Sequence, residues 1–234
     1  MTPSLRIIYQ TIEVGGTDIH LCTLRDTQQF SDPGGVAHGL GISSATWPIF
    51  GVVWPSSIVL ANHMLDYNID GKRILEIGCG IALSSLLLNS RQADITATDY
   101  HPDVEFFLSR NTRLNKSKNI AFERVDWTND DSQLGLFDLI IGSDLLYEDH
   151  HVQLLADFIH NHARPECDAI IIDPGRGRKN KFSSRMQEYG FESSHMKPLH
   201  TDYLDTPFKG YILSFSRKAE AHNTLGLLNQ TDQK

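Results

Sequence analysis

Short apolar runs alternate with amphipathic segments from residue 72 onward. The runs predict buried strands at 73–77, 94–98, 120–125, 137–143 and 169–173. The amphipathic segments predict helices at about 82–92, 102–115, 149–163 and 178–189, and in the third helix one stripe is formed by Val152, Leu155, Ala156 and Ile159. This alternation predicts a parallel sheet with right-handed crossovers. Two further runs, 191–196 and 211–216, are joined by a loop without a helix, which predicts an antiparallel pair.

The first fifty residues have a different pattern. Residues 5–14 and 18–25 predict a hairpin around Gly15-Gly-Thr17, and the polar, Gly-rich stretch 26–46 predicts a mobile loop. Two Trp-Pro pairs follow, and Pro55 suits the first turn of a helix. Trp47 and Trp54 could each pack in the core or line a site. We expect an extension over 1–50, a main domain over 51–217 and a polar tail over 218–234.

A glycine turn ends the first strand of the main domain. The apolar run before it breaks at Gly78-Cys-Gly80, and an apolar helical pattern follows. A strand, glycine turn and helix in this order present backbone N–H groups to a ligand. Asp99 ends the next strand, where a carboxylate can accept hydrogen bonds from both ribose hydroxyls of an adenosine ligand.

An adenosine ligand leaves two candidates, a dinucleotide and S-adenosylmethionine. The dinucleotide pattern requires a third glycine where this chain has Leu83. Glu76, just before the turn, suits an ammonium group better than a pyrophosphate. Both observations favour S-adenosylmethionine, whose methionine part carries that ammonium.

Composition narrows the function classes. The net charge of −8 and the pI near 5.7 argue against a nucleic-acid surface and are compatible with a basic protein substrate. Three widely spaced cysteines indicate a reducing compartment, and we expect a cytoplasmic protein because no secretory signal and no membrane-spanning run are found. His150 and His151 are adjacent, and His160 and His162 face different sides of a helix, so we expect no metal.

Five motifs in order resemble methyltransferase family 16, which is similar to the protein-lysine methyltransferases of the seven-strand class. They lie between about residues 45 and 175: Val53-Trp-Pro55, Leu75-Glu-Ile-Gly-Cys-Gly80, Thr98-Asp99, Asp126-Trp127 and Ser143-Asp-Leu-Leu-Tyr147. The resemblance implies a Rossmann-like class I α/β fold. In this fold a doubly wound, mostly parallel seven-strand sheet has an antiparallel last strand, here with an N-terminal hairpin extension.

The resemblance also implies roles for site residues. Glu76, Gly78 and Gly80 would face the methionine part of the cofactor. Asp99 would bind the ribose, and Asp126 and Trp127 would bind the adenine. Ser143 would also contact the cofactor, and Trp54 would close over it. Asp144 would orient the acceptor amine, and Tyr147 would form a wall of its channel. Asp144 could instead cap a helix. The loop Ile171–Gly177 could line the substrate entrance or simply end a strand.

The acceptor follows from the resemblance and the acidic surface: a protein side-chain amine, namely lysine. The alternatives are a small-molecule N- or O-methyltransferase and a non-catalytic S-adenosylmethionine-binding scaffold. Nucleic-acid amino methyltransferases carry prolines after the fourth strand that this chain lacks. We expect a monomer that binds neither nucleic acid nor membrane, with the hairpin 5–25 and the loop 26–50 over the site as a recognition surface or a lid.

Overall fold

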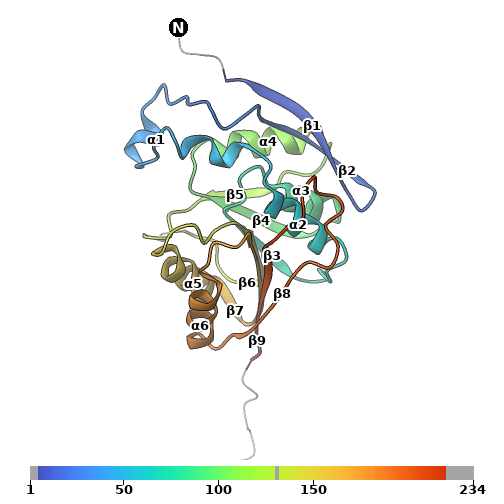
Figure 1. The fold of residues 1–234 in the computed structure, drawn as a ribbon, viewed down its shortest axis with the longest axis vertical. Helices are drawn as coiled ribbons and strands as arrows, with labels where there is room; N and C mark the ends of the chain where they lie inside the picture. The colour runs from blue at the N-terminus through green and yellow to red at the C-terminus, as the bar shows by residue number, and fades with distance from the viewer. Residues whose placement is uncertain (1–4, 130–131, 220–234) are drawn as a thin grey trace, which may run out of the picture.

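A seven-stranded sheet forms the centre of the protein (Figure 1). The computed structural model describes residues 5–129 and 132–219. The strand order is β5-β4-β3-β6-β7-β9-β8. The bounds are β3 (Arg73–Ile77), β4 (Asp94–Asp99), β5 (Ala121–Arg124), β6 (Phe137–Ser143), β7 (Ala163–Asp173), β8 (Glu192–Met196) and β9 (Tyr211–Arg217). Strands β3 to β7 pair in parallel, and β9 runs antiparallel to both β7 and β8. The predicted class I arrangement is confirmed.

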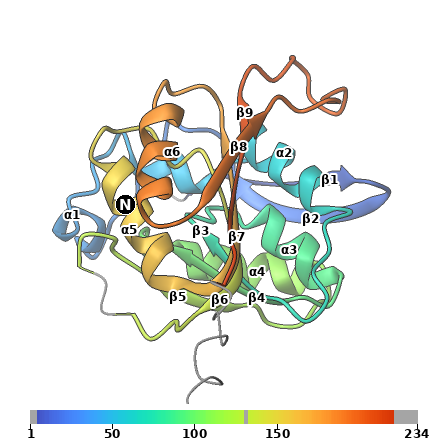
Figure 2. The same cartoon turned by 90° about the horizontal axis from the view of Figure 1, so that it is seen from below.

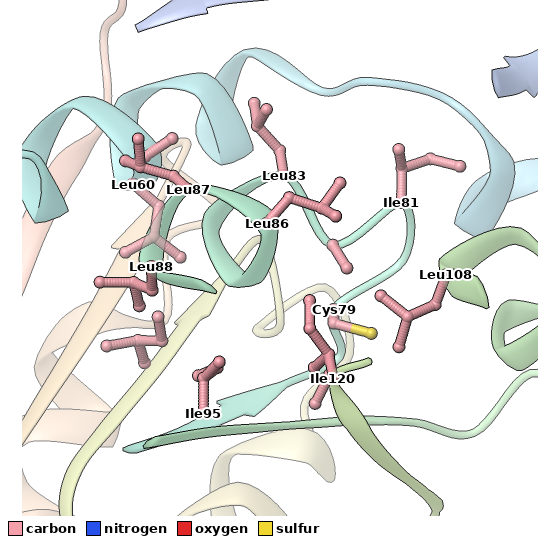
Figure 3. Close-up of a cluster of buried hydrophobic side chains, with 14 of the residues drawn as sticks. Leu60, Cys79, Ile81, Leu83, Leu86, Leu87, Leu88, Ile95, Leu108 and Ile120 are labelled. Carbon is pink, nitrogen blue, oxygen red and sulfur yellow. The ribbon is translucent and has the colours of Figure 1, made fainter. Parts of the chain in front are cut away.

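Helices cover both faces of this sheet (Figure 2). One face carries α2 (Pro55–Met64), α3 (Leu83–Ser90) and α4 (Val104–Leu114), and the other carries α5 (His151–His162) and α6 (Lys179–Glu188). Side chains of a strand alternate between the faces, so Ile74 joins the first core and Leu75 and Ile77 join the second. Figure 3 shows part of the first core, in which side chains of α2, α3, β4 and α4 gather near the glycine turn.

The N-terminal hairpin forms a small sheet of its own. It consists of β1 (Ile7–Val14) and β2 (Thr17–Leu24), and it lies on the outer side of α3 and α4 (Figure 1). Asn111 of α4 accepts a hydrogen bond from the backbone N–H of Cys22 at 2.7 Å, and Asn115 bonds the backbone of His20. These contacts fix the hairpin against the domain, and the prediction of a hairpin is confirmed.

The segment after the hairpin contains two short helices. They are α1 (Val36–Gly39) and the 3₁₀ helix η1 (Trp47–Gly51), both within or next to the stretch expected to be a loop. The carboxylate of Asp32 accepts hydrogen bonds from the backbone N–H groups of Ala37 and His38, at 3.1 and 2.8 Å, and so closes the turn at α1. Local side-chain capping of this kind explains how a polar, Gly-rich stretch acquires a helical turn.

Strand β7 begins earlier than predicted. The apolar run suggested a start at residue 169, but the strand begins at Ala163 and its pairing with β6 shifts register between Phe137 and Leu139. Pro165 and its charged neighbours look like a loop in the sequence. Arg217 of β9 donates hydrogen bonds to the carbonyl oxygens of Ala163 and Arg164, at 2.9 and 2.7 Å, and stabilises the extended start.

No helix in the described ranges is long and apolar enough to span a bilayer. Of the expected polar tail, residues 220–234 lie outside the described residues.

Candidate active site

A cavity of about 780 Å³ lies at the carboxyl ends of the central parallel strands. The chain runs from β3 through β4 to β5 on one side and returns to β6 on the other, and such a reversal leaves a crevice at the strand ends. All predicted site residues except Glu76 line this cavity: Trp54, Gly78, Gly80, Asp99, Asp126, Trp127, Ser143, Asp144 and Tyr147. Residues from four strand ends and the loop before α2 therefore meet around one space.

The glycine turn after β3 requires its glycines. Gly78 and Gly80 have φ of +59° and +52°, a region that favours glycine. A Cβ on Gly80 would lie 3.0 Å from the carbonyl oxygen of Phe50, and one on Gly78 would lie 2.5 Å from the Leu145 side chain. The turn is thus packed between η1 and the loop after β6, with its backbone at the cavity wall.

Asp99 connects the ends of β3 and β4. Its carboxylate accepts hydrogen bonds from the backbone N–H of Gly80 at 2.8 Å and from that of His101 at 2.9 Å. Burial raises the pKa of Asp99, and the backbone donors act in the opposite direction. Because a carboxylate can accept about four hydrogen bonds, Asp99 can still receive two from a ligand in the cavity.

Glu76 lies beside α3 and does not line the cavity. Its side chain is 3% exposed, and its carboxylate accepts hydrogen bonds from the backbone N–H of Ser85, at 2.9 Å, and from the Ser85 hydroxyl. Burial raises the pKa of Glu76 to about 7, and the nearby charge of Asp99 adds to the shift. Glu76 is therefore a buried group that titrates close to neutral pH.

Asp126 and Trp127 follow β5. One carboxylate oxygen of Asp126 accepts hydrogen bonds from the backbone N–H and the hydroxyl of Thr128, at 2.8 and 2.7 Å. Its other oxygen receives no hydrogen bond from the described part of the chain. The indole of Trp127 packs against His151 and Phe158 of α5, with ring centroids 5.8 and 6.3 Å away. A free acceptor and an aromatic ring thus stand side by side at the cavity wall.

Asp144 has a strained backbone and a charged partner. Its φ is +54°, unusual for a residue with a side chain, and its backbone N–H donates to the carbonyl oxygen of Ile172 at 2.8 Å. The guanidinium of Arg176 donates to both carboxylate oxygens, each at 2.8 Å. Helix α5 begins at His151, so Asp144 does not cap it. Its carboxylate is held facing the cavity.

Tyr147 and Trp54 contribute aromatic rings to the cavity lining. The side chain of Tyr147 is 48% exposed and meets His151 edge-on, with ring centroids 4.5 Å apart. Partial burial raises the pKa of Tyr147 to about 12, with the charge of Asp99 as a second cause, so the phenol stays neutral at physiological pH. The indole N–H of Trp54 donates to the carbonyl oxygen of Ile49 at 2.8 Å.

The two Trp-Pro pairs separate into two roles. Trp47 is fully buried and packs edge-on against Phe50 and His101, so for this residue the core interpretation is correct. Trp54 ends the loop that leads into α2, and Pro55 occupies the first turn of that helix as predicted.

A second cavity of about 610 Å³ adjoins the first. Trp54, Asp144 and Arg176 line both cavities, and the remaining wall comes from Pro55, Ser56, Pro174, Gly175 and residues 206–209. The loop Ile171–Gly177, considered as a possible entrance, therefore does reach the site. Its Arg176 was not singled out from the sequence, where only the position at a strand end pointed to it.

The predicted recognition surface is divided by the structure. Residues 41, 42, 46, 49 and 50 of the loop line the first cavity. Among the described residues, neither cavity is lined by the hairpin strands, because β2 packs on α3 and α4 instead. The hairpin thus does not form the wall of the site.

The histidine-rich start of α5 also differs from expectation. Glu148, His150 and His151 line the first cavity, and their potential ligand atoms lie within 4.8 Å of one another. The spacing of the histidines alone does not predict this grouping, because its third member is Glu148.

Comparisons with known proteins bear on the family and the fold. A sequence model described as lysine methyltransferase matches residues 43–188. The protein-lysine methyltransferase METTL21E of Bos taurus is 27% identical over 164 residues, which cover 64% of this chain and 57% of that protein. A histidine protein methyltransferase 1 homolog of Dictyostelium discoideum is 32% identical over 120 residues, or 47% of this chain and 38% of that protein.

The matched segments thus span about three fifths or less of these relatives.

Among solved structures, the 16S rRNA methyltransferase RsmC of T. thermophilus, in complex with AdoMet and guanosine, superposes with a TM-score of 0.61 at 17% identity. The superposition covers 92% of this chain and 51% of the RsmC chain, and the likeness shows a shared fold. Because the family match extends over more than half of the sequence and spans the strands that build the cavity, the chain belongs to the lysine methyltransferase family.

Proposed function

We propose that this protein transfers a methyl group from S-adenosylmethionine to a lysine side chain of a protein, releasing S-adenosylhomocysteine. The observation that carries the proposal is the cavity of about 780 Å³ at the strand ends, which is lined both by the predicted adenosine-binding residues and by Asp144 and Tyr147. Membership in the lysine methyltransferase family supports the choice of acceptor.

The chemistry of the cavity fits the cofactor. The oxygen of Asp126 that receives no bond from the described residues can accept from the adenine amino group, beside the flat ring of Trp127. Asp99 retains acceptor capacity for the ribose hydroxyls. We assign the methionine part to the backbone of Gly78 and Gly80, with the charge of Glu76 behind it.

Ser143 and Trp54 complete the proposed cofactor site. Ser143 ends β6 and lines the cavity next to Asp144. Trp54 would close over the cofactor, with its indole N–H held by the carbonyl oxygen of Ile49. No metal ligand is required by these roles.

The acceptor would be held by Asp144 and Tyr147. When bound, the cofactor supplies a methyl group on a sulfonium, which needs little further activation. Asp144 would accept a hydrogen bond from the lysine amine and so fix the direction of attack. Because a carboxylate also favours the charged ammonium, Asp144 would contribute orientation and would not deprotonate the lysine. The lysine proton would leave to solvent past the half-exposed Tyr147. The neutral Tyr147 ring would attract the cation before deprotonation.

An imidazole acceptor is the second candidate. It is favoured by the relative named as a histidine protein methyltransferase, which is 32% identical over 120 residues. The hydrogen-bonding role of Asp144 would be similar for a ring N–H. The two candidates differ in the product, which hydrolysis of the labelled protein separates.

One labelling experiment tests the proposal. A lysate from cells lacking the protein is incubated with the purified protein and S-adenosylmethionine labelled in its methyl group, and macromolecules are separated from small molecules. Methyl-lysine in a discrete labelled protein would support the proposal, and methyl-histidine would select the second candidate. Label confined to small molecules would refute a protein substrate. Binding of S-adenosylmethionine with no transfer of label, even at high concentration of the wild-type protein, would indicate a scaffold.

We also propose a cytoplasmic location. Cys22, Cys79 and Cys167 are buried and unpaired, the state that a reducing compartment maintains. Fractionation of cells that express the tagged protein would test this, and recovery in an oxidising compartment would contradict it.

A further inference from the structure

The Asp144–Arg176 ion pair lies on the boundary between the two cavities. Both residues line both spaces, and the guanidinium holds each carboxylate oxygen at 2.8 Å. If Asp144 receives the acceptor amine, as proposed above, its carboxylate is already occupied by a cation in the free protein. A charged lysine that approaches this carboxylate therefore competes with Arg176 for it.

Displacement leaves an arginine in need of a partner. The side chain of Arg176 is 44% exposed, and it is flanked by Gly175 and Gly177, whose φ values of +105° and +80° are accessible chiefly to glycine. Because its side chain is half-exposed, Arg176 can move its guanidinium away from Asp144 by side-chain rotation, while its backbone N–H stays bonded to Asp173 at 3.1 Å. Without a new partner, the guanidinium of Arg176 would stand beside the charged acceptor lysine, which is unfavourable because like charges repel at close range.

The second cavity carries an excess of positive charge. Its lining contains Arg176 and Lys209, while its one carboxylate is the already paired Asp144. Among the described residues, no carboxylate is paired with Lys209. Residues 174–219 contain nine Lys and Arg against four Asp and Glu, whereas the whole chain contains 21 against 29. The segment that supplies Arg176 and Lys209 thus differs in the sign of its net charge from the chain as a whole.

We propose, on the basis of the function proposed above, that the second cavity binds the target protein beside its acceptor lysine and recognises a carboxylate there. The two charge pairs would exchange partners: the lysine takes Asp144, and an Asp or Glu of the target takes Arg176, with Lys209 as the second cation. The exchange keeps every charge compensated. Because the two groups of the ion pair are in direct contact, the target carboxylate lies within about three residues of the lysine, a chain reach of about 10 Å.

A different role for Arg176 makes a distinct prediction. The carboxylate of the cofactor's methionine part could pair with this guanidinium, since Arg176 also lines the first cavity. Substitution would then change the KM for S-adenosylmethionine. Recognition of the target changes the KM for the acceptor protein instead.

The test begins with mapped methylation sites. Lysate proteins methylated by the wild-type protein are identified by mass spectrometry, and a target is prepared with the Asp or Glu nearest its lysine changed to Asn or Gln. We expect this change to raise the KM for the target about tenfold, as for a lost charged hydrogen bond, with the KM for S-adenosylmethionine within twofold. The Arg176→Gln variant should have the same KM for the acidic target and for the amide target. The Lys209→Gln variant should prefer the acidic target less strongly than the wild-type protein does. Lys181→Gln, an exposed change on α6 outside both cavities, is the matched control.

Two failures are distinguishable. Methyl-lysine at sites without a nearby carboxylate, or equal use of the acidic and amide targets by the wild-type protein, would refute the exchange and leave the proposed function standing. A change of the cofactor KM alone in Arg176→Gln would assign Arg176 to the cofactor. Absence of methyl-lysine from the wild-type reaction would refute the proposed function and the exchange with it.

Discussion

Replacing Glu76 with glutamine should stabilise the protein at alkaline pH. In the folded chain Glu76 is buried and has a pKa of about 7, against 4.5 for the exposed group. At about 1.4 kcal/mol per pKa unit, ionising this carboxylate in the folded state costs about 3 kcal/mol. Glutamine keeps an oxygen that can accept both hydrogen bonds of Ser85 and cannot ionise.

The sign follows from proton binding. Between pH 4.5 and 7 the folded state binds more protons than the unfolded state, so the contribution of Glu76 to stability falls as pH rises and is constant above pH 7. The difference in the free energy of unfolding between Glu76→Gln and wild type should thus be below about 1 kcal/mol at pH 5 and about 3 kcal/mol at pH 8. Urea denaturation at both pH values measures it, and other titrating groups cancel in the comparison. A difference that does not change with pH would refute the assignment of a raised pKa.

The same variant tests the proposed contact with the cofactor ammonium. If the ammonium lies near Glu76, binding favours the ionised carboxylate, so affinity falls below pH 7. Calorimetry with S-adenosylhomocysteine should show wild-type affinity dropping close to tenfold more than that of Glu76→Gln between pH 7.5 and pH 6. Titration of the ligand itself is common to both proteins. Parallel pH profiles would show that Glu76 does not contact the ammonium.

Three further substitutions test the site. Gly80→Ala should weaken cofactor binding at least tenfold and lower the free energy of unfolding by about 1–2 kcal/mol, because the φ of Gly80 is +52° and a Cβ there would lie 3.0 Å from the Phe50 carbonyl oxygen. Calorimetry measures the affinity and denaturation measures the stability. Wild-type values of both would contradict a role of the turn. Asp99→Ala should weaken cofactor binding by about 1–3 kcal/mol in the same assay, as for a buried carboxylate that loses its hydrogen bonds; unaltered affinity would place the ribose elsewhere. Asp144→Asn should lower kcat with S-adenosylhomocysteine affinity within about twofold, and full turnover would mean that another residue holds the amine.

Residues at strand ends could be found from the sequence because of the sheet's topology. Parallel strands with right-handed crossovers bring their carboxyl ends to one edge. Asp99, Asp126 and Asp144 each follow a predicted strand, so their meeting around one cavity required no knowledge of packing. The glycine pattern likewise marked a turn that no larger residue could occupy.

Side-chain partners required the tertiary structure. Glu76 precedes the glycine turn as expected, but its carboxylate bonds to Ser85 and is withdrawn from the cavity wall. Whether a side chain at a strand end faces a cavity or a helix depends on how the next helix packs. The hairpin also could not be placed from its own pattern, because its position depends on Asn111 and Asn115 of α4.

Four features could be predicted from the chain alone: the succession of strands and helices, the antiparallel last pair, the glycine turn and the acids that end successive strands. These features depend on local periodicity and on chain-direction rules, which are readable along one dimension. Three features became visible in the folded chain: Arg176 pairs with Asp144 across 32 positions of sequence, a second cavity adjoins the first, and Glu148, His150 and His151 converge. Such contacts depend on side-chain reach between separate loops, and the hydrophobic pattern that specifies the sheet carries no information on charged groups outside the core.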